Sequence, residues 1–292
     1  MLIRRLAVIG VGLIGGSLAR ALRAAGEVGE VVGCGRGKAN LDRAVELGVV
    51  DRYSHDVGAA VEGADVVFVA VPLGAMRETF AAMRERLAPD GVVTDGGSAK
   101  GSVVADARAA FARPLSFFVP GHPIAGTERT GVEASFATLF RDRRVILTPL
   151  SDNDPAAVDR VAAMWRACGA EVAEMSVGHH DEVLAATSHL PHMLAFGLVD
   201  ALARMKENDE IFRYAAGGFR DFTRIASSSP VMWRDICLAN REALSHMLER
   251  FAVEMTDLAD AIRRGDGEQL LEIFSRAKAA RDRYVDGMRG GE

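Results

Sequence analysis

Short, continuous runs of apolar residues alternate with amphipathic stretches along the first half of the chain. The apolar runs predict strands at residues 4–9, from 31 onward, and at 64–71, 92–95, 117–119, 144–148 and 171–175. The amphipathic stretches predict helices at residues 17–25, 38–47, 74–87 and 101–111. Uninterrupted apolar runs are typical of strands buried on both faces, and their alternation with helices favours parallel pairing. We therefore expect an α/β domain built on a doubly wound, mostly parallel sheet.

From Gly178 onward the pattern is purely helical, with long segments at residues 181–205, 231–264 and 267–285. The middle segment carries an apolar stripe at spacings of three, four or seven: Ile236, Ala243, Met247, Phe251, Met255, Leu258 and Ile262. A stripe of this length is more than a small domain hides, which predicts a homodimer through the C-terminal helices. The alternative is that the stripe packs wholly within its own domain. We place the boundary between a sheet domain at 1–177 and an all-helical domain at 178–292.

The composition favours a globular protein with a small-molecule partner. The chain has 292 residues, 49% of them hydrophobic and 26% charged, and its net charge of −5 comes from interspersed acids and bases. No long basic run is present, so we expect no nucleic-acid partner. No segment reaches the roughly 18 apolar residues of a membrane span, so we expect no membrane partner. The widely spaced Cys34, Cys168 and Cys237 are expected to be buried thiols in a reducing compartment, which predicts a cytoplasmic location.

A glycine-rich turn between the first strand and the first helix predicts a dinucleotide site. It reads Gly10-Val11-Gly12-Leu13-Ile14-Gly15. The first glycine permits the tight turn, the second lets backbone amides approach a pyrophosphate, and the third lets the helix pack close to the strand. Leu13 and Ile14 in this turn, with Val71 and Pro72 at the end of the strand 64–71, are the further expected cofactor contacts. We therefore expect a Rossmann-like NAD(P)-binding domain at 1–177.

The end of the second strand leaves the choice of dinucleotide open. An acidic residue there would bind the ribose hydroxyls of NAD, but the sequence reads Gly33-Cys34-Gly35-Arg36-Gly37-Lys38. Arg36 suits the 2′-phosphate of NADP or stacking on adenine, and the alternative is a side chain that only faces solvent. We therefore expect NAD(P)+ without deciding between NAD+ and NADP+.

Two further strand ends carry polar side chains at the edge where ligands bind in such sheets. Ser98 follows the strand 92–95, where it either caps the next helix or serves as an active-site donor. His122 lies in a run rich in glycine and proline, Pro120-Gly121-His122-Pro123-Ile124-Ala125-Gly126. A rigidly held imidazole can accept a hydroxyl proton near neutral pH, which an alcohol oxidation requires.

Several separate groups of residues, in order along nearly the whole chain, resemble the prephenate/arogenate (cyclohexadienyl) dehydrogenase family. They are the glycine turn at 10–15, Asp95-Gly-Gly-Ser98-Ala-Lys-Gly101, Gly121-His-Pro-Ile-Ala-Gly126, Ser188-His189-Leu190-Pro191-His192, the run 217–226 and Met232-Trp233-Arg234-Asp235. The resemblance implies oxidative decarboxylation of prephenate, arogenate or both, with hydride passing to NAD(P)+, as a step of tyrosine biosynthesis. It also implies that residues 178–292 bind the substrate and form the dimer.

The resemblance assigns roles to individual residues. His122 would take the ring hydroxyl proton, and Ser98 would orient His122 and the nicotinamide. Arg224 would clamp a substrate carboxylate with its two-pronged guanidinium, and His192 would contact the substrate side chain with His189 in support. Proline at 191 is expected to kink the helix that carries both histidines.

Weaker assignments follow from the same resemblance. Thr127 and Glu128 would gate the cleft or contact the substrate, although Glu128 alternatively caps or pairs at the surface. Asp221 and Trp233 would support Arg224. No metal is expected, because His189 and His192 lack further ligands at suitable spacing. His179 and His180 are expected at an exposed start of a helix.

Two other function classes remain as alternatives. A two-domain dehydrogenase of the β-hydroxyacid type shares both halves of the expected architecture, but such enzymes rely on a catalytic lysine in the helical half. A non-enzymatic dinucleotide-sensing regulator would keep the glycine turn without needing His122. Because the sequence starts at the first predicted strand and ends a few residues after the last predicted helix, we also expect a monofunctional enzyme, without a chorismate mutase or ACT domain.

Overall fold

The computed structural model describes residues 1–127, 129–206 and 208–289. By its internal contacts the chain divides into two units, Met1–Leu244 and Ser245–Glu292.

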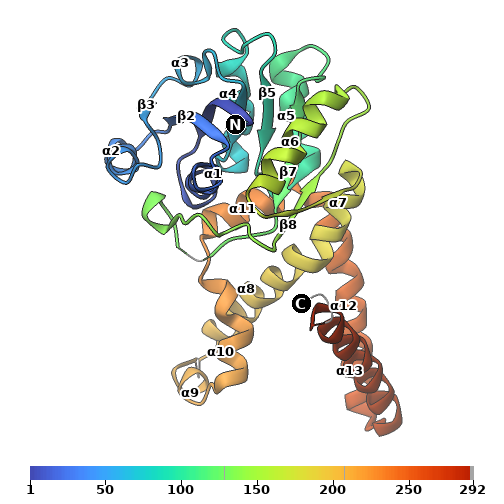
Figure 1. Ribbon diagram of the computed structural model, residues 1–292. Coiled ribbons are helices and arrows are strands. Elements are labelled where there is room, and N and C mark those ends of the chain that lie inside the picture. The colour runs from blue at the N-terminus through green and yellow to red at the C-terminus, as the bar shows by residue number, and fades with distance from the viewer. Residues whose placement is uncertain (128, 207, 290–292) are drawn as a thin grey trace. The chain divides into compact units, whose positions relative to one another are not determined.

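Six parallel strands form the central sheet of the first unit, in the order β3-β2-β1-β4-β5-β6 (Figure 1). The strands are β1 (Ile3–Ile9), β2 (Val28–Cys34), β3 (Arg52–Ser54), β4 (Val66–Val69), β5 (Val92–Asp95) and β6 (Phe118–Val119). The order runs outward from β1 in both directions, as in a doubly wound nucleotide fold. The predicted parallel α/β sheet is confirmed.

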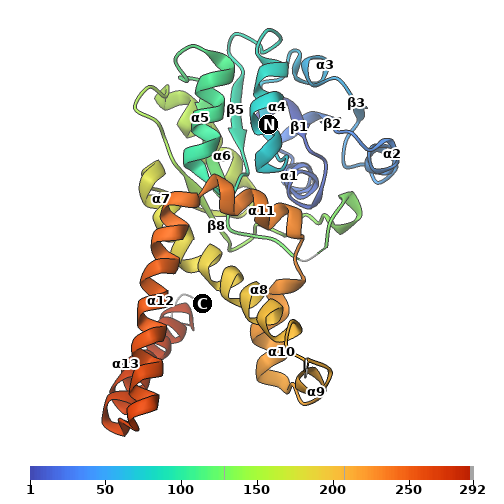
Figure 2. The same cartoon turned by 180° about the vertical axis from the view of Figure 1, so that it is seen from behind.

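Alternate residues of the inner strands point to opposite faces of this sheet, and each face has its own core. Leu6 and Val8 pack on the side of α1 and α6, whereas Ala7 and Ile9 pack on the side of α4 and α5. Comparison of Figures 1 and 2 shows α5 and α6 on opposite sides. The flanking helices are α1 (Leu13–Ala24), α2 (Lys38–Glu46), α3 (Val57–Val61), α4 (Met76–Met83), α5 (Lys100–Phe111) and α6 (Pro155–Ala167). Burial on both faces explains why the strands read as continuous apolar runs.

A second, three-stranded sheet was not anticipated by the sequence pattern. β7 (Gly121–Pro123) pairs antiparallel with β8 (Arg144–Leu147), which pairs in parallel with β9 (Glu171–Glu174). Pro120 separates β6 from β7, and because proline has no N–H it cannot continue a strand ladder as a donor. The expectation that the segments 144–148 and 171–175 belong to one parallel sheet is therefore wrong, although both are strands.

The helical part of the first unit begins with α7 (Val177–Leu184), which passes through a π-helical turn, Ala185–His189, into α8 (Leu190–Ala203). In a regular α-helix the ring of Pro191 would clash with the carbonyl group of Thr187, and the wider π turn just before it relieves this conflict. The expected irregularity at Pro191 is thus a π turn. The remaining helices are α9 (Asn208–Arg213), α10 (Gly217–Thr223) and α11 (Pro230–Ala239).

Asn240 interrupts the long helical segment predicted at 231–264. The chain forms α11 up to Ala239 and α12 (Arg241–Arg264) after it, so the prediction of one continuous segment is wrong. Asn240 is buried, and its side chain bonds to groups of α7 and the π turn. An asparagine that is engaged elsewhere in this way competes with regular helix geometry.

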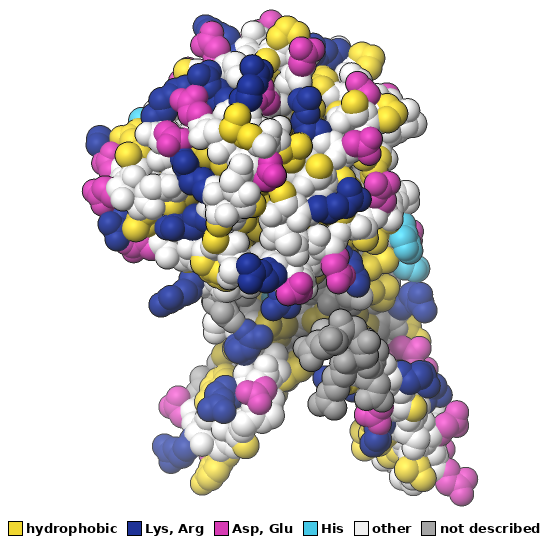
Figure 3. Space-filling model, viewed as in Figure 1, with side chains coloured by type: hydrophobic (Ala, Val, Ile, Leu, Met, Phe, Trp, Pro, Cys, Tyr) yellow, Lys and Arg dark blue, Asp and Glu magenta, His cyan; other side chains and the backbone are white. Residues whose placement is uncertain are grey.

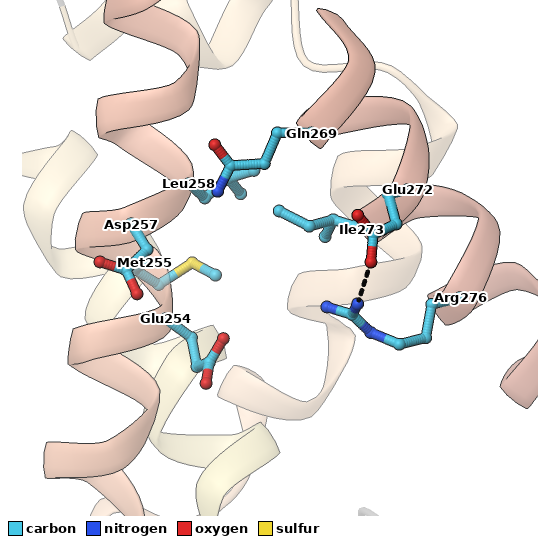
Figure 4. Close-up of a pocket in the computed structure, with 8 residues that line it drawn as sticks. All are labelled: Glu254, Met255, Asp257, Leu258, Gln269, Glu272, Ile273 and Arg276. Atoms are coloured by element: carbon cyan, nitrogen blue, oxygen red, sulfur yellow. Dashed lines mark hydrogen bonds and ion pairs between the residues drawn. The ribbon is translucent and has the colours of Figure 1, made fainter. Parts of the chain in front are cut away.

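The second unit consists of most of α12 and of α13 (Gly267–Arg289). Figure 4 shows a pocket between these two helices, with Met255, Leu258 and Ile273 among charged and polar side chains. Large apolar side chains stay exposed on this unit, among them Ile262 and Phe274. Such a surface is typical of a protein interface.

Charges of both signs are interspersed on the face shown in Figure 3. Among the described residues, none of the helices combines the length and the apolar character that a membrane span requires.

All three cysteines are free thiols. Burial raises the pKa of the Cys34 thiol to about 11 and that of Cys168 to about 12, so neither is a ready nucleophile. Cys237 is only half-buried, with its Sγ 3.2 Å from the sulfur of Met193, so the expectation of three buried thiols is wrong for this residue.

Candidate active site

The glycine turn between β1 and α1 has the geometry of a phosphate-binding loop. Gly10 has a positive φ of 100°, and a Cβ atom there would lie 2.3 Å from the carbonyl oxygen of Ala70. A Cβ atom at Gly15 would lie 2.2 Å from the carbonyl oxygen of Gly10, so the helix packs closer than any side chain allows. At Gly12, by contrast, a Cβ atom would meet no atom within 4 Å, and no side chain caps the start of α1. Backbone N–H groups thus face open space, which fits the pyrophosphate of a dinucleotide.

Arg36 lies exposed in the loop between β2 and α2. The loop is held from the neighbouring strand by His55, whose Nδ1–H donates to the carbonyl oxygen of Gly35 (2.8 Å). A guanidinium group at this strand end is compatible with either dinucleotide, because it can stack on adenine or pair with a 2′-phosphate.

A fully buried ion pair lies at the end of β5. Lys100 Nζ is 2.5 Å from Asp95 Oδ2 and donates to the carbonyl oxygen of Gly121 at the same distance, and neither charged side chain is exposed to solvent. Asp95 also accepts the backbone N–H groups of Gly97 (2.8 Å) and Gly121 (3.2 Å). Burial lowers the pKa of Lys100, an effect that the Asp95 carboxylate opposes. This pair joins the strand end of β5 to the backbone that carries His122.

His122 lies in β7, buried, with its ring beside that of His180. The Nδ1 atom of His122 is 2.9 Å from Nε2 of His180, and Nδ1 of His180 is 2.8 Å from Oδ1 of Asp181. Burial, the nearby Lys100 ammonium group and the neighbouring histidine rings hold the pKa of His122 well below its ordinary value. The ring is therefore neutral at pH 7 and able to accept a proton.

The expectation of an exposed helix start at 179–180 is correct for His179 but wrong for His180. His180 has no exposed surface, because α7 packs against α5 and turns this ring toward β7. The ring of His179, one residue earlier, faces outward.

Asp181 caps helix α5 from a distant part of the chain. Its two carboxylate oxygens accept the backbone N–H groups of Lys100 and Gly101, each at 2.8 Å. Burial alone would raise the pKa of Asp181, but the hydrogen bonds from His180 and these two N–H groups outweigh it and lower that pKa. Ser98 does not cap the helix, because Ala99 occupies the N-cap position without a side-chain bond. Ser98 is half-buried in the loop between β5 and α5.

His189 is buried in the π turn beside Asn240. The amide Nδ2 of Asn240 donates to the backbone carbonyl oxygen of Asp181 (2.9 Å) and lies 3.1 Å from Nδ1 of His189. The other ring nitrogen, Nε2, has no hydrogen-bond partner among the described residues. Burial lowers the pKa of His189 to about 4. A buried N–H without a partner is costly, so this nitrogen is suited to donate to a ligand.

His192 stacks on the indole ring of Trp233, with ring centres 3.8 Å apart and an angle of 24° between the planes. Its Nδ1–H donates to the carbonyl oxygen of Ser188 (2.8 Å), which leaves Nε2 for other contacts. Burial lowers the pKa of His192, and the positive charge of Arg224 lowers it further, so Arg224 lies near this ring. Arg224 is exposed at the end of α10.

The other predicted contacts are not gathered around His122 in the same way. Thr127 is exposed, and its hydroxyl oxygen accepts the N–H of Arg129 (3.3 Å). Asp221 is exposed beside Arg220, 3.8 Å away. Glu128 lies outside the described residues.

Sequence reasoning missed five residues of this site: Asp95, Lys100, His180, Asp181 and Asn240. Asp95 and Lys100 belong to the run 95–101, but the family resemblance assigned no role to either residue. An acid and a base that flank a short glycine-rich turn between two apolar elements are a usable signal of a buried pair. No comparable local signal marks His180 or Asn240, because their partners are distant in the sequence.

A glycine turn suited to a dinucleotide and a buried, neutral histidine define the class of dinucleotide-dependent dehydrogenases. Two family models match the chain: the nucleotide-binding domain of prephenate dehydrogenase over residues 18–174, and the dimerization domain of prephenate dehydrogenase over residues 176–276. The chain belongs to the prephenate dehydrogenase family of NAD(P)-dependent oxidoreductases.

Individual relatives agree along almost the whole chain. The cyclohexadienyl dehydrogenase of Zymomonas mobilis is 41% identical over 280 residues, which cover 95% of both chains. The prephenate dehydrogenase of Bacillus subtilis is 36% identical, covering 94% of this chain and 74% of its own. The crystal structure of A. aeolicus prephenate dehydrogenase in complex with hydroxyphenyl propionate and NAD+ superposes with a TM-score of 0.89 at 38% identity, covering 95% of this chain and 97% of that one.

Proposed function

We propose that this protein oxidises and decarboxylates prephenate, arogenate or both, as a step of tyrosine biosynthesis. The observation that carries the proposal is His122, a buried and neutral histidine fixed at the end of β5 through Gly121 and the Asp95–Lys100 pair. The ends of β1 and β5 lie on the same edge of a parallel sheet, so the base and the glycine turn lie at one edge, where ligands bind in such sheets.

A bound nicotinamide would supply the hydride acceptor for the ring carbon that bears the hydroxyl group. The dinucleotide would be held at the start of α1 by Gly10, Gly12, Leu13, Ile14 and Gly15, with Val71 and Pro72 after β4 as further contacts. Val71 and Pro72 follow the strand that packs against Gly10, which supports this assignment.

His122 takes the hydroxyl proton on Nε2, and its low pKa keeps that nitrogen available in the resting protein. Ser98 orients His122 and the nicotinamide from the loop after β5. The ring then loses carbon dioxide and becomes aromatic as a phenolate, which takes the proton back from His122, so the protein has only to move the proton and hold the substrate in register.

Residues of the helical part bind the substrate carboxylates and the substrate side chain. Arg224 binds a carboxylate with two parallel N–H donors, and His189 supplies its buried N–H. His192 contacts the substrate side chain from the face of Trp233, which holds its ring flat. Thr127 and Glu128 are assigned to the substrate by the family resemblance alone, and Asp221 supports Arg224.

The protein acts as a homodimer through its C-terminal helices. The match to a dimerization domain supports this, as do the exposed Met255, Ile262 and Phe274 of the second unit. The functional boundary lies between the NAD(P)-binding residues 1–177 and the helical residues 178–292, which bind the substrate and form the dimer, and the edges of the two family models at 174 and 176 support it. The three free thiols support a cytoplasmic location.

The direct test supplies prephenate and arogenate, each with NAD+ and NADP+, and follows the absorbance of the reduced nicotinamide together with release of carbon dioxide. Turnover of at least one substrate with stoichiometric carbon dioxide is expected. If none of the four combinations turns over, the proposed function is wrong.

The His122→Asn variant separates the enzyme from a dinucleotide-sensing regulator. Dinucleotide binding should persist, because the substituted side chain lies outside the glycine turn, while turnover should fall by about 10²–10⁴. Undiminished turnover would remove His122 from the mechanism. Turnover of 3-hydroxy acids in place of prephenate and arogenate would support the β-hydroxyacid alternative.

A further inference from the structure

Two side chains outside the predicted set, the buried His180 and the partly buried Asp181, form a line from the proposed base into the helical part of the first unit. His122 Nδ1 lies 2.9 Å from His180 Nε2, and His180 Nδ1 lies 2.8 Å from Asp181 Oδ1. His122 comes from β7, whereas His180 and Asp181 come from α7. Neither the family resemblance nor the comparisons assign a role to His180 or Asp181.

The positions of the hydrogens along this line follow from Asp181. Its carboxylate already accepts two backbone N–H groups, and it is ionised, so it can only accept a hydrogen bond from His180. Nδ1 of His180 therefore carries a hydrogen, and in the tautomer with this one ring hydrogen Nε2 carries a lone pair. That lone pair accepts a hydrogen bond from the Nδ1–H group of His122. Nε2 of His122 is left without a hydrogen.

We propose that His180 and Asp181 are positioning residues that hold His122 in the tautomer whose Nε2 accepts the substrate's proton. The inference rests on the proposed function for the source of that proton. As the ring hydroxyl is oxidised, its proton binds Nε2 of His122. The resulting cation keeps its Nδ1–H in the hydrogen bond to His180, whose own Nδ1–H stays on Asp181. The carboxylate, fixed by the start of α5, thereby balances the charge that develops on His122.

The other charged groups around His122 cannot supply this orientation. Lys100 from α5 and Asp95 from β5 are paired with each other, and the ammonium group has no lone pair to accept the Nδ1–H of His122. His189 from the π turn directs its Nδ1 toward Asn240. Without His180, the His122 ring would be free to take the tautomer with hydrogen on Nε2, which cannot accept a proton at that nitrogen.

Nuclear magnetic resonance of the whole enzyme tests the tautomer without any substitution. The protein is labelled with ¹⁵N at its seven histidines, and long-range ¹H–¹⁵N couplings show which ring nitrogen of each carries hydrogen. Spectra of His122→Gln and His180→Gln assign the two signals. Both rings are expected with hydrogen on Nδ1 at neutral pH. A His122 ring with hydrogen on Nε2 would overturn the proposal, whether or not the enzyme turns over prephenate.

Kinetics of His180 variants test the consequence. His180→Leu removes the acceptor and should lower kcat by about 10²-fold or more, while the KM values for substrate and dinucleotide change by less than about threefold. His180→Gln places an amide oxygen near the position of Nε2 and should recover at least about a tenth of the lost rate. The matched control is His179→Gln, at the exposed neighbouring histidine, which should keep the original kcat.

Two results would contradict the proposal. Unchanged kcat in His180→Leu would show that the hydrogen bond is not needed. Equal losses in His180→Leu and His180→Gln, or losses confined to KM, would show that His180 only fills space. Circular dichroism checks that each variant is folded. If His180→Leu does not fold, the tautomer of His122 measured by nuclear magnetic resonance in the unsubstituted enzyme tests the proposal.

Discussion

The buried pair of Lys100 and Asp95 sets the position of the strand end that carries His122, and its removal should be costly. Lys100→Met keeps most of the side-chain volume but removes the ammonium group. Among the described residues, Asp95 would then retain only the N–H groups of Gly97 and Gly121 as partners for a charge with no solvent exposure. Removing one partner of a buried ion pair typically costs about 3–5 kcal/mol in the free energy of unfolding.

That cost is large enough to measure in several ways. For a unit of this size each kcal/mol corresponds to about 2–4 °C in Tm, so a fall of about 6–20 °C is expected. Urea unfolding of the dinucleotide-free protein, followed by circular dichroism, gives the free energy directly. The double variant Lys100→Met/Asp95→Asn should recover about 2 kcal/mol or more, because no buried charge is then left without a counter-charge.

The control is Lys278→Met in α13. Lys278 is also 2.5 Å from a carboxylate, that of Asp282, but both side chains are more than half exposed. Exposed pairs of this kind contribute about 0.2–1 kcal/mol at most. If Lys100→Met costs no more than Lys278→Met, or if the double variant is no more stable than the single one, the buried pair does not organise this strand end.

Three further predictions concern the helical residues and the cofactor. Arg224→Lys should raise the KM for substrate by about 10–100-fold with a smaller change in kcat, because lysine cannot bind both carboxylate oxygens at once. An unchanged KM in steady-state kinetics would refute this prediction. Arg36→Asp should lower the ratio of kcat/KM for NADP+ over NAD+ by about tenfold or more, and an unchanged ratio would mean that Arg36 only faces solvent. His189 has its pKa lowered from 6.5 to about 4, so between these values the unfolded chain binds a proton that the folded protein does not. The contribution of neutral His189 to the free energy of unfolding should therefore be fully present above pH 6.5 and fall by roughly 3 kcal/mol as the pH drops to 4. In His189→Gln, the slope of the urea-derived free energy of unfolding against pH in this window should decrease by the equivalent of about one proton. An unchanged slope would contradict this assignment.

Much of the fold could be predicted because strands buried on both faces leave a strong local signal. The apolar run at 64–71 and the glycine turn at 10–15 fixed two adjacent strands and the ligand-binding edge between them. The second sheet could not be predicted, since nothing in the segments 144–148 and 171–175 tells which partner each strand takes. The helix break at Asn240 could not be predicted for a related reason. A single polar residue in a helical pattern gives no local sign of a break, because the partners that engage its side chain are distant in the sequence.

The site residues likewise divide into those that a local sequence signal marks and those that only distant packing reveals. Residues in glycine-rich or proline-rich strand ends, such as His122, could be found because their surroundings are unusual in sequence. His180 could not, because a polar run after Ser176 has the pattern of an exposed helix start, and His179 follows that pattern. Only the packing of α7 against α5 distinguishes the two neighbouring histidines.

The cap that Asp181 places on α5 has a consequence for the order in which the protein matures on the ribosome. The strands and the glycine turn of the nucleotide-binding half emerge first and can begin to fold as they leave the tunnel. The first turn of α5 must wait for a carboxylate about eighty residues further along the chain, and so must the ring that orients His122. A nascent chain therefore gains a place for the cofactor before it gains an oriented base, so the catalytic function is completed only when both halves have come together.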